Sequence, residues 1–181
     1  MGGVLLLLTL PLTAQPTRPE IYGQFGVLRL AGDEGSLGSG AAYGAAAIVP
    51  FTRRWALDID VLTAKVESER PDPDLFSERR LLVAPSLVAR WGTERFYGYA
   101  GGGVGLQSEF SRFRFQTYSG SPPQPSGIVS GKATEHGMTL HGKVGFVISP
   151  AGHLLLRADF LLPFRYVLPS VGLKLGVGYR F

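Results

Sequence analysis

Hydrophobic and polar residues alternate with a period of two along most of the chain beyond residue 20. Alternation of this kind, in segments of about ten residues, predicts β-strands. The clearest case is the C-terminal segment VGLKLGVGYRF, where every odd-numbered residue from Val171 to Phe181 is apolar. Eight segments of this kind predict an all-β protein, with strands near residues 20–30, 40–51, 55–66, 79–91, 95–110, 135–148, 153–162 and 171–181.

The connections between these segments alternate in length. Tight turns are predicted at residues 51–54, 92–94 and 149–152. The other connections are longer and polar or rich in Gly and Pro, and we expect the stretch from Tyr118 to Gly131 to be mobile. This rhythm places all the short turns at one end of the sheet and all the long loops at the other, which is the layout of an outer-membrane β-barrel. The long connections are residues 31–39, 65–78, 111–134 and 163–170.

A sheet that enters lipid has to close on itself, because hydrocarbon offers no hydrogen-bond partner to an unpaired strand edge. We therefore expect the last strand to pair with the first, in an eight-stranded antiparallel up-and-down transmembrane β-barrel over residues 15–181. Such closure would also hold the apolar C-terminus, although chain ends usually fray. Side chains fill the interior of an eight-stranded barrel, so no open pore is expected.

Pairing the strands through their turns keeps apolar residues on one face and charged residues on the other. Pairs whose numbers sum to 302 place Lys143 opposite Asp159, and pairs that sum to 333 place Asp159 opposite Lys174. In the hairpin over residues 79–110, a sum of 187 pairs Arg90 with Tyr97. The charged face is too ionic for the dry core of a small soluble barrel. We therefore predict an ion-paired interior that contains Lys143, Asp159 and Lys174, and an apolar face that meets lipid.

Composition agrees with this interpretation. Hydrophobic residues make up 45% of the 181 residues and charged residues only 18%, against roughly 25% in soluble domains. The absence of cysteine excludes a disulfide framework and thiol chemistry. The net charge of +4 is spread along the chain without a basic run, so no nucleic-acid partner is expected.

The N-terminus carries a predicted targeting signal. Residues 4–12, VLLLLTLPL, are too short for a spanning helix of about 20 residues but have the length of a secretory apolar region. We predict a signal peptide over residues 1–14, with cleavage after Ala14, although Met1 to Gly3 contain no basic residue. The alternative is a buried N-terminal strand or helix.

With these features the chain resembles the small eight-stranded outer-membrane β-barrels of the OmpA and OmpX type, often called porin-family proteins. In that family the last residue is aromatic and apolar residues occupy every second position before it, a pattern read by the outer-membrane assembly machinery. The resemblance implies a monomer in the outer membrane of a Gram-negative-type bacterium, with outer-membrane lipids, the assembly machinery and possible lipopolysaccharide contacts as its partners, and it says little about activity. The matching residues here are Leu173, Leu175, Val177, Tyr179 and Phe181.

Candidate catalytic and ligand-binding residues are few. His136 and His141 are five apart, which points them to opposite faces of a strand, so they do not chelate one metal ion. The His-x-Ser-Asn pattern of lipid A deacylases is absent. Residues 98–106, GYAGGGVGL, lack the helix that a phosphate-binding loop needs. Asp58 and Asp60 share one strand face and are expected to be interior ion-pair partners. We therefore expect no enzyme activity, no cofactor and no metal.

The third outer loop is basic and aromatic, with Arg112, Arg114 and Lys132 beside Phe113 and Phe115. It is either a contact site for lipopolysaccharide phosphates or another surface ligand, or an ordinary extension of the neighbouring strands. We expect a structural outer-membrane barrel whose outer loops interact at the cell surface. Two alternatives stay open: a lipid-modifying enzyme on the same barrel, and a soluble exported barrel that binds an apolar ligand.

Overall fold

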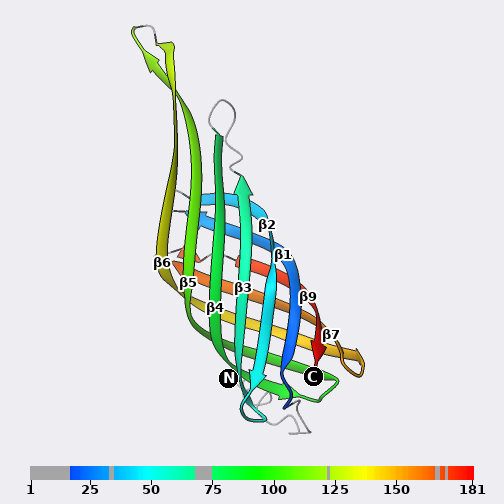
Figure 1. Ribbon diagram of the computed structural model, residues 1–181. Coiled ribbons are helices and arrows are strands. Elements are labelled where there is room, and N and C mark those ends of the chain that lie inside the picture. Colours follow the sequence, from blue (N-terminus) through cyan, green and yellow to red (C-terminus); the bar gives the residue numbers. More distant parts are fainter. Residues whose placement is uncertain (1–16, 33–34, 68–74, 122, 166–167, 170) are drawn as a thin grey trace, which may run out of the picture.

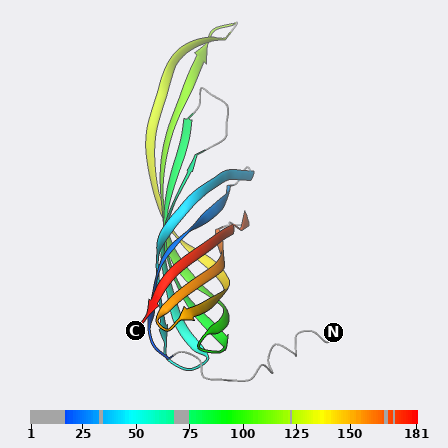
Figure 2. The ribbon, with the colours of Figure 1, turned by 90° about the vertical axis from the view of Figure 1, so that its right-hand side faces the viewer.

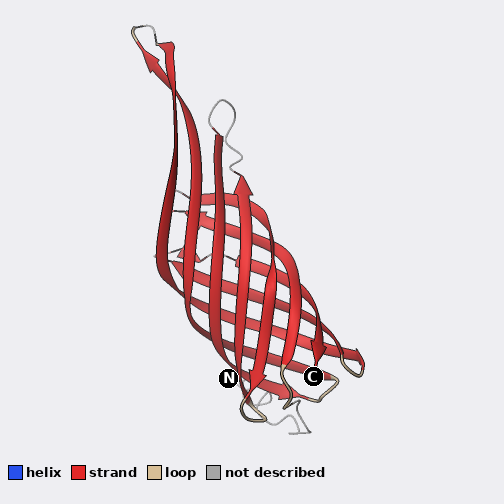
Figure 3. Cartoon of the chain, in the orientation of Figure 1, coloured by secondary structure: helices blue, strands red, loops and turns tan. Residues whose placement is uncertain are grey.

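The computed structural model describes residues 17–32, 35–67, 75–121, 123–165, 168–169 and 171–181, so the predicted signal peptide lies outside the described residues. All regular structure in these residues is β, and none of it is a helix with the length and hydropathy to cross a membrane (Figure 3). The strands are β1 (Glu20–Gly32), β2 (Gly35–Pro50), β3 (Trp55–Glu67), β4 (Leu75–Gly92), β5 (Phe96–Ser119), β6 (Gln124–Ala151), β7 (Leu154–Arg165), β8 (Leu168–Pro169) and β9 (Val171–Arg180).

Eight long strands form one closed antiparallel sheet (Figure 1). Strands β1 to β7 pair in chain order, β9 pairs with β7, and β9 also pairs with β1, while the two-residue β8 pairs with the end of β7. The predicted closure is confirmed, because Glu20 lies opposite Arg180 and Arg29 lies opposite Val171. The C-terminus is held as expected, since the amide of Phe181 donates to the carbonyl oxygen of Pro19 at 3.2 Å. The fold is therefore the predicted eight-stranded up-and-down barrel.

The two faces of the sheet that forms the barrel wall have the orientation that a membrane barrel requires. The Leu173 side chain is 47% exposed and that of Phe160 48%, whereas Asp159, beside Phe160 on β7, is 1% exposed. Lys174, beside Leu173 on β9, is 2% exposed. The alternating pattern therefore points apolar side chains outward and charged side chains into the interior, which is the arrangement of a membrane barrel.

The predicted register is right for the last hairpin and wrong by two residues for the other two. Asp159 lies opposite Lys174, as expected. Lys143, however, lies opposite Leu161 rather than Asp159, because Gly152 adopts a positive φ of 51° and moves the reversal one residue along the chain. Similarly, Arg90 lies opposite Tyr99 and not Tyr97. A shift of two residues preserves the face of every side chain, so the division between interior and exterior is unaffected.

The outer connections differ most from the prediction. Residues 111–134 were expected to be a long loop that is mobile from Tyr118 to Gly131, but they continue β5 and β6 as a paired ribbon as far as Ser119 and Gln124. The ribbon projects far beyond the ends of β1, β7 and β9 (Figure 2). Strand β4 supports its base, since Leu75 lies opposite Arg114. Glycine and proline content suggested a loop, but the residues on either side of the tip form a continuous antiparallel ladder instead.

Candidate functional site in the barrel interior

The centre of the barrel holds a cluster of six charged side chains, three acidic and three basic. The acids are Asp58 and Asp60 on β3 and Asp159 on β7, and each is at most 1% exposed. Their alternation along the strands places all of them on the interior face. The cations are Lys143 on β6, Arg157 on β7 and Lys174 on β9. We call these six residues the central cluster, and their formal charges cancel.

The two lysines of the central cluster each bridge two carboxylates. The Lys143 Nζ lies 2.8 Å from Asp58 Oδ2 and also forms an ion pair with Asp60. The Lys174 Nζ lies 3.0 Å from Asp60 Oδ1 and 3.0 Å from Asp159 Oδ1. Asp60 thus joins the two lysines. The cluster links β3, β6, β7 and β9 across the interior, and it couples strands that are not neighbours in the sheet.

The guanidinium of Arg157 lies between Asp58 and Asp159 in the central cluster. Its Nη2 lies 2.7 Å from Asp58 Oδ2, and its Nε donates to Asp159 Oδ2 at 2.5 Å. The guanidinium carbon lies 5.1 Å from the ring centroids of both Tyr22 and Tyr99, within cation–π range. Tyr99 also donates its hydroxyl to Asp159 at 2.8 Å. A planar donor fork between two carboxylates and two rings has little freedom to rotate, so Arg157 fixes the geometry of the cluster.

A second cluster lies nearer the short turns, around Glu20 on β1. The Arg180 Nε donates to Glu20 Oε1 at 2.9 Å, and the Tyr22 hydroxyl donates to Glu20 Oε2 at 2.5 Å. Tyr97 donates to the same carboxylate, and the Arg90 guanidinium carbon lies 4.4 Å from the Tyr97 ring centroid. Glu20 therefore ties the first strand to the last strand at the closure of the barrel.

A third cluster lies toward the outer end and combines one cation with two acids. Arg80 on β4 forms an ion pair with Glu78 on the same strand and lies 3.4 Å from Glu109 on β5. Gln107 donates to Glu109 at 2.5 Å. Between this group and the central cluster, Leu62, Leu82, Ala84 and Leu161 form a buried apolar layer. The interior is thus filled by three ionic clusters together with buried apolar side chains.

The structure places the predicted interior residues as follows. Lys143, Asp159 and Lys174 all lie inside the barrel, and Asp159 and Lys174 pair directly. Lys143 pairs instead with Asp58 and Asp60. Hairpin register alone could not reveal this, because β3 and β6 are not adjacent in the sheet. The apolar–acidic alternation of the WALDIDV segment was the available signal for two inward carboxylates.

The histidines do not converge. His136 is exposed and its Nδ1 lies 2.9 Å from Ser108 Oγ, whereas His141 is buried with its Nε2 2.7 Å from Ser86 Oγ. The prediction of opposite faces is therefore confirmed. Ser86 and His141 have the atoms of a nucleophile and a base. The Nδ1 of His141 has no hydrogen-bond partner among the described residues, so no third group orients this pair there. The described residues also contain no group of three ligands suited to a metal ion.

Comparison with known proteins adds evidence on the fold. No family model matches the sequence, and no curated protein matches it. Among solved structures, the attachment invasion locus protein Ail of Yersinia pestis, in complex with the heparin analogue sucrose octasulfate, is similar with a TM-score of 0.61 and 16% identity over 91% of this chain and 99% of that one. The outer membrane protein OprG of Pseudomonas aeruginosa is similar with a TM-score of 0.59 and 14% identity, over 93% of this chain and 98% of that one. Neisserial surface protein A is similar with a TM-score of 0.56 and 13% identity, over 90% of this chain and 97% of that one. At these identities the likeness establishes the architecture, that of small outer-membrane β-barrels.

Proposed function

We propose that the protein is a non-enzymatic, monomeric barrel in the outer membrane of a Gram-negative-type bacterium, and that it presents its β5–β6 ribbon to polyanionic groups at the cell surface. The single observation that carries this proposal is a row of basic residues on the outward side of the ribbon. The fold supports the location, because the apolar exterior and ionic interior suit lipid around the wall. The outward row that ends in Tyr179 and Phe181 supports recognition by the assembly machinery, which we also propose.

The basic row follows the strand registers. Arg112 on β5 lies directly opposite Lys132 on β6, and both side chains are exposed. Arg114 lies one outward position farther along β5. On the neighbouring strands Lys65 lies opposite Arg79, and Arg79 donates to Thr63 at 3.2 Å. Like charges directly across a strand pair destabilise it, so the Arg112–Lys132 pair supports a function that gains from positive charge.

A polyanion is the ligand class that this row fits. Arg and Lys bind sulfate and phosphate oxygens through charge-assisted hydrogen bonds, and Arg does so with a planar fork. The structure of Ail was determined with a sulfated sugar. We propose the same chemistry for the ribbon, with sulfated glycans or the phosphates of lipopolysaccharide as ligands. Phe113 is half-buried on the opposite side of β5, where its ring lies over Gly131, so it does not belong to the basic row.

The test is binding to immobilised heparin by the protein reconstituted in detergent. Arg112→Gln combined with Lys132→Gln removes two charges, and at about 1 kcal/mol per basic residue the affinity should fall on the order of thirtyfold at low salt. Arg53→Gln combined with Arg54→Gln removes the same charge from the turn between β2 and β3 and is the matched control. Equal losses in the two variants would show that only net charge matters and would refute a site on the ribbon.

A further inference from the structure

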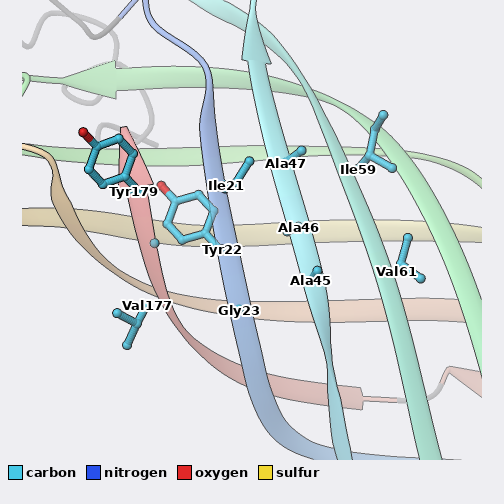
Figure 4. Close-up of a pocket in the computed structure, with 11 residues that line it drawn as sticks. Ile21, Tyr22, Gly23, Ala45, Ala46, Ala47, Ile59, Val61, Val177 and Tyr179 are labelled. Atoms are coloured by element: carbon cyan, nitrogen blue, oxygen red, sulfur yellow. The ribbon is translucent and has the colours of Figure 1, made fainter. Parts of the chain in front are cut away.

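The outer wall carries an apolar hollow of about 630 Å³ over β9, β1, β2 and β3 (Figure 4). Two rows of outward residues cross it. In one row Gly23 lies opposite Ala45 and Val177, and Ala45 lies opposite Val61. In the next row toward the turns, Ala47 lies opposite Ile59. The small side chains form the floor of the hollow and the larger ones form its walls.

Internal packing does not account for the glycine in this floor. A Cβ on Gly26 would collide with the carbonyl oxygen of Leu173, and a Cβ on Gly44 with that of Val61. A Cβ on Gly23 would meet no atom within 4 Å. A larger residue would therefore fit at Gly23 and bury more apolar surface in lipid. Its absence leaves room for something outside the chain.

The hollow is bounded differently at its two ends. Toward the loops, Phe25 and Tyr43 lie opposite each other, and each is 58% exposed. Toward the turns, the β2–β3 connection carries Arg53 and Arg54, both exposed and neither in an ion pair with any described residue. Ala47 is three residues, about 10 Å, from the end of β2 at Pro50, and Arg53 and Arg54 lie in the turn beyond that end, so they are roughly 10–15 Å from the floor of the hollow. One leaflet of a hydrocarbon core about 30 Å thick has a similar depth.

We propose that this hollow binds an acyl chain of an anionic phospholipid, with the lipid phosphate held by Arg53 and Arg54. Basic side chains at the membrane surface attract anionic headgroups, and a guanidinium matches a phosphate in a bidentate way. The apolar lining matches the chain. The proposal rests on the membrane location proposed above, but it is independent of ligand binding by the ribbon.

A second copy of the protein is the competing occupant, and the charges oppose it. A two-fold contact brings the same surface of both copies together. In the plane of a membrane it would place Arg53 and Arg54 of each copy at the same depth and on the same side. Four guanidinium groups would then repel one another unless an anion lay between them. A phospholipid meets both the apolar and the charged part of this surface.

The test counts phospholipids retained by the detergent-purified protein in native mass spectrometry, after equilibration with equal amounts of phosphatidylglycerol and phosphatidylcholine. The wild-type protein should retain one phosphatidylglycerol. Ala45→Phe fills the hollow, and the loss of about two methylene contacts should reduce retention about tenfold. Ala41→Phe is the matched control, because Ala41 is also exposed and outward on β2 but lies beyond Tyr43. Equal effects of the two substitutions would overturn the proposal.

The headgroup is tested with the two charge variants described above. Arg53→Gln combined with Arg54→Gln should abolish the preference for phosphatidylglycerol, while Arg112→Gln combined with Lys132→Gln should keep it. A wild-type protein that retains no lipid, or both lipids equally, would refute the site. Gly23→Cys supplies the single thiol of a chain that has none, so efficient disulfide-linked dimers in membranes would identify a second copy as the occupant instead. Heparin binding by the ribbon would survive each of these failures.

Discussion

The projecting ribbon continues β5 and β6 of the barrel wall, yet the two regions have different surroundings. In the wall, Lys143 on β6 is 3% exposed and buried among carboxylates, while the neighbouring outward Val144 is 46% exposed. In the ribbon, Val129 and Ile128 are neighbours on the same strand and are 50% and 59% exposed. Alternation therefore separates two environments only where the sheet closes. Beyond the closed part, both faces of β6 are in contact with solvent.

The difference predicts where mutations are costly. Each inward charge in the wall is desolvated and depends on its partners, so the removal of one partner leaves an uncompensated ion. In the proposed membrane location, each outward residue in the wall is in contact with lipid. Ribbon residues that are exposed on both faces, such as Ile128 and Val129, are in contact with water, so substitutions at these positions should be tolerated.

The largest effect is expected from Asp159→Leu. The substitution leaves three cations against two carboxylates in the central cluster, and we expect a loss of about 3–5 kcal/mol in the free energy of unfolding. Urea denaturation in detergent micelles, followed by the mobility shift of unheated samples on gels, measures it. Adding Lys174→Met to this variant restores equal charges and should recover most of the stability. An Asp159→Leu protein as stable as the wild type would contradict an interior role for this carboxylate.

How much of the site follows from the sequence depends on which strands are neighbours. The Asp159–Lys174 pair follows from the pattern, because β7 and β9 are joined by one hairpin and the alternation fixes the face. The pairing of Lys143 with Asp58 and Asp60 does not, because it crosses the interior between strands that share no hairpin. The reach of side chains across the closed barrel sets these partners.

The same distinction applies to the fold. The number of strands, the closure of the sheet, and which side chains point inward or outward followed from periodicity and from the requirement for paired edges. The register of two hairpins depended on turn backbones, such as the positive φ at Gly152, which alternation does not encode. The length of β5 and β6 was underestimated because residues 111–134 have a composition typical of loops. Cross-strand hydrogen bonds over this stretch join residues that carry no regular pattern of burial.

A somewhat smaller effect is expected for a charge on the lipid-facing wall. Leu175 on β9 is 46% exposed and lies beside Phe25 and Ala158 within the apolar exterior. Leu175→Arg should destabilise the barrel in lipid vesicles, lowering its free energy of unfolding by about 2–4 kcal/mol, because a guanidinium in the hydrocarbon region loses its hydration. Ile128→Arg, on the ribbon, should change it by less than about 0.5 kcal/mol. Similar penalties at the two positions would mean that the ribbon also lies in lipid.

The smallest effect is expected at the turns, where the two regions can be compared most directly. Gly152, between β6 and β7, has φ of 51°, and Gly120, at the tip of the ribbon, has φ of 89°. Alanine strains either position by about 1 kcal/mol, because its Cβ disfavours positive φ. Gly152→Ala should lower the unfolding free energy of the barrel by that amount, since a Cβ there meets no other atom and only backbone strain remains. Gly120→Ala should leave global unfolding unchanged and accelerate protease cleavage at the ribbon tip, because the ribbon opens locally without the barrel. If Gly120→Ala instead destabilised the whole barrel, the ribbon and the wall would unfold as one unit, and the tolerance expected for the ribbon would not hold.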